Sequence, residues 1–188
     1  MVVLYTWLVA RLWAGIQHEG KYANLLLLFS EGLVIAFMLV RRRARDVSLK
    51  PDEWLLALAA TCLPLLATPG GKQLVPAGVA GMVLVAGILV QLHAKVTLGR
   101  SFGLIPANRG LKLQGPYRFV RHPMYAGYLI CHLGYLAVNP TWWNLGVYSL
   151  CLGFQLLRLL AEERLLARDE SYRSYRTAVP YRLIPAVF

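Results

Sequence analysis

Long apolar blocks separated by short polar segments dominate the chain. The blocks are Leu25 to Val40, Trp54 to Ala67, Val75 to Leu92 and Trp142 to Leu160, and a shorter apolar segment covers Met124 to Val138. Each block is about long enough to cross a thin hydrocarbon layer as a helix. The pattern predicts an all-α protein, a polytopic membrane helix bundle.

The first apolar segment, Val2 to Ile16, contains Arg11 and two tryptophans. A long basic side chain can extend to the headgroups while tryptophans anchor a helix at the interface. This segment is therefore either a sixth span or an interfacial helix, and we prefer the sixth span. The bundle is expected to contain five to six transmembrane helices.

Basic residues determine the expected orientation. The chain is 57% hydrophobic and 15% charged, with a net charge of +11, and its basic residues concentrate at Arg41 to Arg45 and in the loop from Gly99 to Arg121. Threading the helices with these segments in the cytoplasm places every strongly basic segment on one face, as the positive-inside rule expects. Because no basic helix stands free of the apolar segments, we expect no binding of nucleic acid.

The three cysteines lie inside apolar blocks and form no Cys-x-x-Cys pair. They are expected to be small core residues, and no metal site is predicted.

The loop before Met124 to Val138 carries the first chemically informative stretch, Arg121-His122-Pro123-Met124-Tyr125-Ala126-Gly127. Pro123 suits the first position of a helix and disfavours helical geometry at His122. His122 should therefore project at the start of the helix, where unpaired amides favour an anion. The alternative is that Arg121 and His122 only contact lipid headgroups.

A second cluster ends the last apolar block. Arg158 and Glu162 are four residues apart and share a helix face, and Gln155 lies one turn earlier. They either form an ordinary surface ion pair or face a polar cavity, since ionisable groups on an apolar helix are costly in lipid. The segment after Tyr172 is too polar to span a membrane and is expected to fold back over the cytoplasmic end.

These stretches together resemble the isoprenylcysteine carboxyl methyltransferase family and its wider group, the phospholipid methyltransferases. The matching motifs are Leu98-Gly99-Arg100-Ser101-Phe102, Gly115-Pro116-Tyr117, Arg121-His122-Pro123-x-Tyr125-x-Gly127, Asn139-Pro140, Arg158-x-x-x-Glu162-Glu163, Tyr172-x-x-Tyr175 and Val179 to Pro185. The resemblance covers roughly residues 75–188. It implies a single membrane domain over 1–188, with N-terminal helices of unassigned role in 1–74 and a catalytic region in 75–188.

The resemblance also implies a methyl donor, S-adenosyl-L-methionine, bound between the last helices and the C-terminal segment. The residues it places at the cofactor are His122, Pro123, Tyr125, Ile130, Tyr135, Leu136, Ala137, Val138 and Glu162. It places Arg158 on the carboxylate of the substrate, as the catalytic and substrate-binding residue. The expected partners are membrane lipid and a lipophilic small molecule or lipidated cysteine that serves as methyl acceptor.

The residue types suit a donor with a sulfonium, an α-carboxylate and an amine. Glu162 can bind the amine or a ribose hydroxyl, His122 and the helix start at Pro123 can bind the carboxylate, and a tyrosine ring can face the sulfonium. The expected location is a bacterial inner membrane, with the active site facing the cytoplasm.

Three other functions stay open from the sequence. The tail from Val179 to Pro185 also resembles the C-terminal region of sterol reductases, which use NADPH. A phospholipid N-methyltransferase and a non-enzymatic membrane scaffold are the others, although a scaffold has no need for Arg158 and Glu162 on one helix face.

Overall fold

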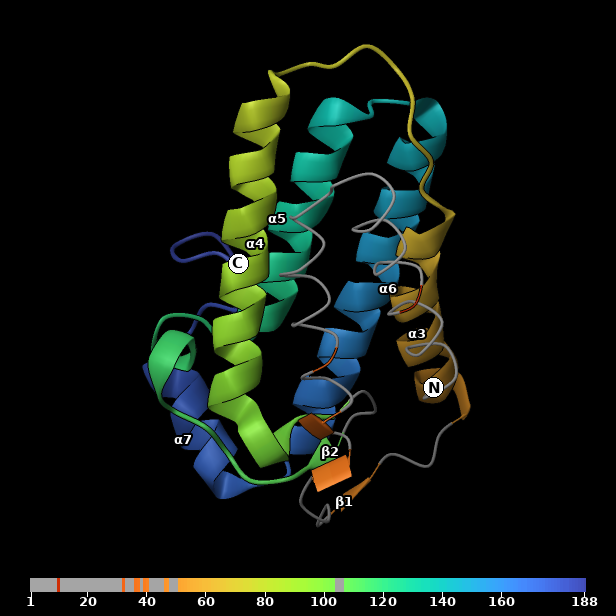
Figure 1. Cartoon of the computed structure of the whole chain (residues 1–188). Coiled ribbons are helices and arrows are strands. Elements are labelled where there is room, and N and C mark those ends of the chain that lie inside the picture. The colour runs from red at the N-terminus through yellow and green to blue at the C-terminus, as the bar shows by residue number, and fades with distance from the viewer. Residues whose placement is uncertain are drawn as a thin grey trace.

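The computed structural model describes residues 51–103 and 107–188, together with eight scattered positions among the first 50. Its helices are α3 (Pro51–Cys62), α4 (Ala77–Leu98), α5 (Pro123–Val138), α6 (Trp142–Leu166) and α7 (Glu170–Ala178). Short 3-10 turns cover η1 (Leu63–Leu66), η2 (Gly99–Ser101) and η3 (Gly115–Arg118). The two-residue strands β1 (Asp46–Val47) and β2 (Ala107–Asn108) pair antiparallel. Figure 1 shows α3 to α6 as an upright bundle, with α7 and the strands near its lower end.

The described helices follow the apolar pattern closely. The segment Met124 to Val138 is α5, which begins one residue earlier at Pro123, and the last block continues to Leu166 as α6. The block expected from Trp54 to Ala67 differs, because α3 begins at Pro51 and ends at Cys62, where η1 replaces it. Pro64 explains this change, since a proline cannot donate the hydrogen bond that would continue an α-helix. The two apolar segments of the first 40 residues lie outside the continuously described part of the chain.

Two of the described helices are long and apolar enough to cross a membrane, Ala77–Ser101 and Trp142–Leu166. Their outer faces expose large apolar side chains, including Leu89 and Val96 on the first and Leu150 and Leu157 on the second. The mostly helical fold class is therefore confirmed for the described residues.

Asn144 holds the end of the bundle that lacks the basic segments. Its side chain accepts from the backbone N–H of Thr68 at 3.0 Å and donates to the carbonyls of Thr68 and Asn139, at 2.8 and 2.9 Å. Thr141 caps α6 by accepting from the backbone N–H of Asn144. The turn before α4 and the turn between α5 and α6 are thereby joined through one buried amide.

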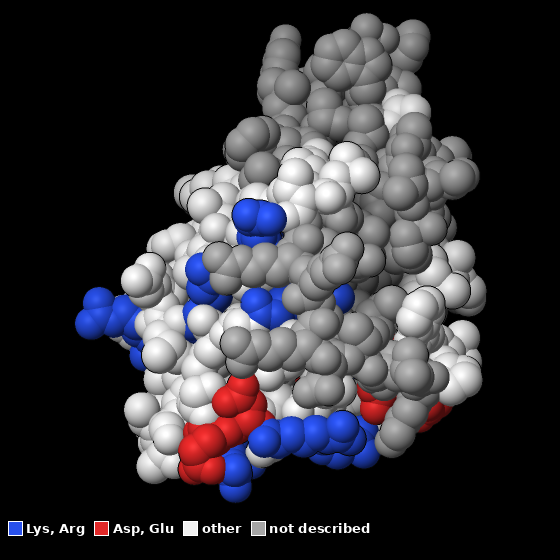
Figure 2. All heavy atoms as spheres, turned by 90° about the horizontal axis from the view of Figure 1, so that it is seen from below, with Lys and Arg blue, Asp and Glu red and all other residues white. Residues whose placement is uncertain are grey.

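The opposite end gathers the polar connections, namely β1, the loop from η2 to η3, and the chain after α6 (Figure 1). Figure 2 looks at this end and shows lysine and arginine side chains spread over it, with a smaller group of acidic ones. The described basic segments thus lie at one end of the bundle, as the charge pattern predicts.

Glycines bring α4 and α5 into close contact. A Cβ at Gly127 would lie 2.6 Å from Gln91 Cγ and 2.8 Å from the carbonyl oxygen of Gly87, and a Cβ at Gly87 would lie 3.0 Å from the carbonyl oxygen of Gly127. Small residues at such crossings let two helix backbones approach within a membrane. The start of α5 is consequently positioned against α4 by backbone contact.

We expect Gly127→Ala to destabilise the protein by about 1 to 3 kcal/mol, because the added methyl group meets helix backbone that cannot yield. Gly153→Ala is the matched control, since a Cβ at Gly153 on α6 meets nothing within 4 Å. That substitution should be neutral or stabilising by up to about 1 kcal/mol through helix propensity. Thermal unfolding in detergent measures both, and equal melting temperatures would contradict the close α4–α5 contact.

Candidate active site

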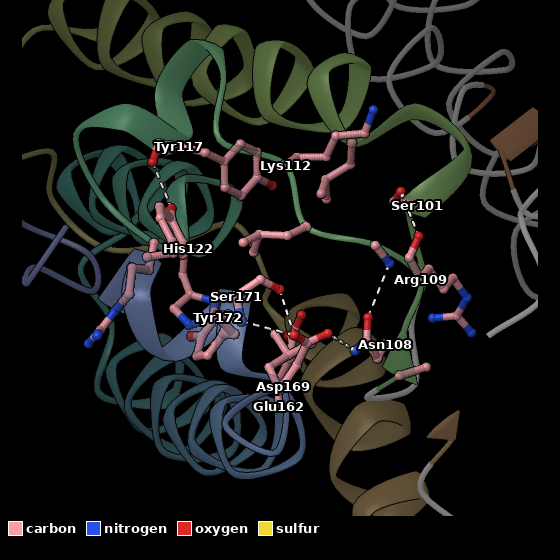
Figure 3. Close-up of a pocket in the computed structure, with 18 of the residues that line it drawn as sticks. Ser101, Asn108, Arg109, Lys112, Tyr117, His122, Glu162, Asp169, Ser171 and Tyr172 are labelled. Carbon is pink, nitrogen blue, oxygen red and sulfur yellow. Dashed lines mark hydrogen bonds between the residues drawn. The ribbon is translucent and has the colours of Figure 1, made fainter. Parts of the chain in front are cut away.

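A pocket opens at the basic end of the bundle, between the helix ends and α7 (Figure 3). The start of α5 contributes His122 and Tyr125, and the end of α6 contributes Glu162. The lining is completed by α7, which contributes Tyr172, and by the segment 107–112. Figure 3 shows Asn108 and Arg109 on one side of the opening and His122 and Tyr172 on the other.

The start of α5 has the geometry that Pro123 predicts. His122 is the N-cap, with φ −129° and ψ 59°, and Pro123 occupies the first helical turn and is fully buried. The backbone N–H of His122 donates to the carbonyl of Arg182, at 2.9 Å. The C-terminal segment therefore pairs with the residues that precede the helix.

Tyr125 joins two of the predicted site residues. Its hydroxyl donates to Glu162 Oε2 at 3.3 Å, and the guanidinium of Arg158 lies 5.5 Å from its ring centroid. Arg158 is only 5% exposed, which rules out an ordinary surface ion pair. Glu162 lines the pocket and Arg158 lies one turn deeper, so Tyr125 is a wall between the pocket and Arg158.

Glu163 is the centre of a buried ionic cluster. Its Oε1 lies 3.1 Å from Arg121 Nε and 3.2 Å from His122 Nε2, and its Oε2 accepts from Arg182 Nε at 3.0 Å. The side chains of Arg121, His122 and Glu163 are each less than a tenth exposed. A buried carboxylate is stable only when it is paired and hydrogen-bonded, so this cluster fixes α6, the start of α5 and the C-terminal segment together.

The C-terminal segment folds back on itself beside this cluster. The backbone N–H of Arg121 donates to the carbonyl of Tyr181 at 2.9 Å, parallel to the His122 contact. The N–H groups of Arg182, Leu183 and Ile184 all donate to the carbonyl of Phe188. The expectation that the tail covers the basic end agrees with this arrangement.

The opposite wall is held by a polar relay from β2 to α7. Asn108 accepts from the N–H of Gly110 and donates to Asp169 Oδ2 at 3.0 Å. Asp169 caps α7 by accepting from the N–H and the hydroxyl of Ser171, at 3.0 and 2.6 Å. The relay places α7 against the loop, so that the tyrosines of α7 face the pocket.

Three tyrosines lining the pocket outside the membrane helices are uncharged donors. Burial raises the pKa of Tyr117 and Tyr172 well above the ordinary tyrosine value. Burial also raises the pKa of Tyr175, to about 12, although the charge of Arg121 lowers it. Tyr175 donates to the carbonyl of Tyr117 at 2.6 Å, whereas the buried hydroxyl of Tyr172 makes no hydrogen bond.

The structure brings together part of the predicted site. His122, Tyr125 and Glu162 line the pocket, with Pro123 between the first two and Arg158 behind Tyr125.

The remaining predicted cofactor residues do not line the pocket; they are Ile130, Tyr135, Leu136, Ala137 and Val138. Leu136 and Ala137 instead line an apolar groove at the other end of α5. An α-helix rises about 1.5 Å per residue, which carries positions 135–138 about 15 Å or more along the axis from Tyr125. Their role at the cofactor stays a prediction that this pocket does not support.

The pocket and cluster residues that received no role from the sequence include Asn108, Glu163, Asp169 and Arg182. Glu163 stands beside Glu162 in the motif, but the resemblance gave a role to Glu162 alone. A helix turns about 100° per residue, so the two neighbours point to different surroundings. Asn108 and Asp169 carried no local signal, because their contact joins positions 61 apart in sequence.

Comparison with known proteins identifies the fold family. The family model described as phospholipid methyltransferase matches residues 75–173, more than half of the chain. The chain belongs to the phospholipid methyltransferase family. The match runs from the start of α4 into α7 and includes every residue of the cluster except Arg182.

One curated relative is Protein-S-isoprenylcysteine O-methyltransferase A of Arabidopsis thaliana, 36% identical over 95 residues. The match covers 46% of this chain and 48% of the relative, so the chain spans about half the length of that protein. The resemblance inferred from the motifs is thus confirmed. Both comparisons support a membrane methyltransferase of the isoprenylcysteine or phospholipid type.

We expect Glu163→Gln to lower the free energy of unfolding by about 3 to 5 kcal/mol, because removing the carboxylate charge leaves buried cations uncompensated. Glu170→Gln is the control, since Glu170 pairs with Arg173 on the surface of α7 with its side chain 79% exposed. Such a pair contributes about 1 kcal/mol or less. Unfolding by heat in detergent compares the two variants, and equal losses would show that the cluster does not hold the fold.

Proposed function

We propose that the protein transfers a methyl group from S-adenosyl-L-methionine to a lipophilic acceptor at the cytoplasmic end of the bundle. The single observation that carries this proposal is the position of Tyr125, which contacts Glu162 on the pocket side and Arg158 one helical turn deeper in the bundle. A water-soluble donor and a membrane-dissolved acceptor need adjacent sites that open to different phases. The shared wall at Tyr125 provides such an arrangement.

The pocket residues fit the proposed cofactor. When bound, S-adenosyl-L-methionine supplies an electrophilic methyl group on a sulfonium, next to an amino acid tail that carries both charges. The pocket offers both charge signs, with the carboxylate of Glu162 and the guanidinium of Arg121 among its lining groups. Glu162 is suited to the amine or a ribose hydroxyl, and aromatic rings such as that of Tyr117 are suited to a cation.

Arg158 is proposed to hold the acceptor carboxylate. Methyl transfer to an ionised carboxylate needs no general base, so the requirements are placement and removal of water from the nucleophile. A guanidinium can bind a carboxylate at two points and orient it. Arg158 is buried one helical turn deeper than Glu162, and we expect the polar end of a lipid-linked acceptor to reach it while the tail remains in hydrocarbon.

The membrane arrangement belongs to the same proposal. We propose five to six spans, including α3 and α5 beside the two long apolar helices, with the catalytic region in 75–188. The basic end faces the cytoplasm of a bacterial cell, where its positive charge is retained.

Labelling of single cysteines tests this orientation. In a chain whose native cysteines are replaced by alanine, a cysteine at Gln73 should react with an impermeant thiol reagent in intact cells. Cysteines at Gln114 and Ser171 should be protected until the membrane is made permeable. All three positions are exposed, so access to the reagent depends on the side of the membrane alone. External labelling at Ser171 would reverse the orientation.

Calorimetric titration of the detergent-purified protein tests the cofactor. S-adenosylhomocysteine should bind, and NADPH should not, in contrast to a sterol-reductase-like enzyme. Glu162→Ala should weaken binding about ten-fold or more, since a hydrogen bond to a charged group contributes about 1.5 to 3 kcal/mol. Arg164→Ala is the control, because Arg164 is exposed on the same helix. Binding of NADPH in place of S-adenosylhomocysteine would refute the methyl donor.

Arg158→Lys tests the acceptor site. Lysine keeps the charge but loses the planar two-point contact, so turnover with a farnesylated cysteine analogue should fall on the order of a hundred-fold. Affinity for S-adenosylhomocysteine should stay near that of the wild type, and Arg164→Lys should change neither. A parallel assay with phosphatidylethanolamine tests the phospholipid alternative. If the enzyme methylates the amine of this lipid and not the carboxylate of the farnesylated analogue, the assignment of Arg158 to an acceptor carboxylate is wrong.

A further inference from the structure

Tyr172 presents the one buried tyrosine hydroxyl among the described residues that lacks any hydrogen-bond partner. The residue is 3% exposed and lines the pocket. Its ring packs against Tyr175 and Val179 in a small apolar cluster of α7, so the ring itself is fully accommodated. Only the hydroxyl is left unsatisfied, and a buried polar group without a partner is costly. This indicates that the hydroxyl serves a ligand of the pocket.

Arg121 presents a second donor to the same pocket. Its side chain is 4% exposed, and its Nε lies 3.1 Å from Glu163 Oε1 but makes no hydrogen bond there. The N–H of Arg121 therefore does not point at that oxygen. Arg121 and Tyr172 line the same pocket, and the charges of Glu163 and Arg121 act on the Tyr172 hydroxyl in opposite directions.

The charges around these two donors are of both signs. Arg121 and Arg182 both carry a positive charge beside the carboxylate of Glu163. Glu162 adds a second carboxylate on the pocket side, where it can bind the amine of an amino acid tail while Arg121 binds its carboxylate. Tyr172 adds a neutral donor, because burial raises its pKa and keeps its hydroxyl protonated. A charged donor and a neutral donor facing one cavity match the two oxygens of a carboxylate.

His122 is less suited to that task than the sequence indicated. Its Nε2 is already engaged by Glu163 Oε1 at 3.2 Å, and its backbone N–H donates to Arg182. The anion site expected at the start of α5 therefore has part of its donors occupied by the protein itself. Arg121 and Tyr172 retain donor capacity toward the pocket.

We infer that Arg121 and Tyr172 form the subsite for the α-carboxylate of the methyl donor, an inference that rests on the proposed function. Glu162 then binds the neighbouring amine. The two groups of an amino acid tail are separated by a single carbon, and the charge of Glu162 also acts on the hydroxyl of Tyr172. Glu162, Tyr172 and Arg121 all line this one pocket, so a single amino acid tail can contact them together.

The test compares S-adenosylhomocysteine with its decarboxylated analogue, which keeps the nucleoside and the amine but lacks the carboxylate. Calorimetric titration of the full chain in detergent should show that Tyr172→Phe weakens binding of S-adenosylhomocysteine about ten-fold, while affinity for the analogue is unchanged. Arg121→Lys should likewise weaken binding of S-adenosylhomocysteine, so that the difference in affinity between the two ligands becomes smaller. Ser174→Ala is the control on the same helix, because Ser174 is exposed, lies outside the pocket lining and donates its hydroxyl to the carbonyl of Glu170.

The outcomes separate this inference from the proposed function. If the wild type binds S-adenosylhomocysteine and Tyr172→Phe weakens both ligands equally, the hydroxyl serves the nucleoside or the fold and the inference is wrong. Equal affinity of the wild type for both ligands would also overturn it, because no carboxylate subsite would then exist. A wild type that binds neither ligand refutes the proposed function itself. Melting temperatures of all variants establish that each is folded.

Discussion

The carboxylate of Glu163 is the constraint on which the basic end of the molecule depends. A carboxylate buried this deeply costs several kcal/mol unless cations and hydrogen-bond donors surround it. Arg121 and His122 come from the chain before α5, and Arg182 comes from beyond α7. These segments can meet only if the tail folds back, as the paired backbone contacts of residues 121 and 122 with 181 and 182 show. The pocket exists between them because Glu163 holds both.

The helices were predictable because each depends on local information. Apolar blocks predicted α4, α5 and α6, and Pro123 predicted where α5 begins, since proline restricts its own φ and the residue before it. Helical spacing correctly placed Arg158 and Glu162 on one face, where both contact Tyr125. The early end of α3 was missed because the apolar pattern continues through Pro64, where the backbone has no N–H to donate.

The site was only partly predictable because its polar contacts join distant positions. Helical spacing put Glu162 on the face of Arg158, and the resemblance put it at the cofactor, but neither gave Glu163 a role. Only the packed structure shows that Glu163 faces Arg121 and Arg182. The contact between Asn108 and Asp169 likewise depends on where α7 docks. The family resemblance assigned positions 130 and 135–138 to the cofactor, but the described pocket ends near the first turn of α5.

The short stretch from Arg121 to Gly127 explains why the motif is more informative than the hydrophobicity around it. Arg121 and His122 face Glu163, Tyr125 faces Glu162 and Arg158, and Gly127 lets the backbone of α5 approach α4. Each of these positions contacts a partner that a different side chain could not satisfy. The glycine contact fixes the position of α5 against α4. The ionic cluster of Glu163 fixes the C-terminal segment beside the first residues of α5. Tyr125 lies between these two fixed points, so its position relative to both Glu162 and Arg158 is set by contacts outside the pocket. The acceptor site that we propose at Arg158 depends on such support, because a displacement of about 1 Å is enough to misplace reacting groups.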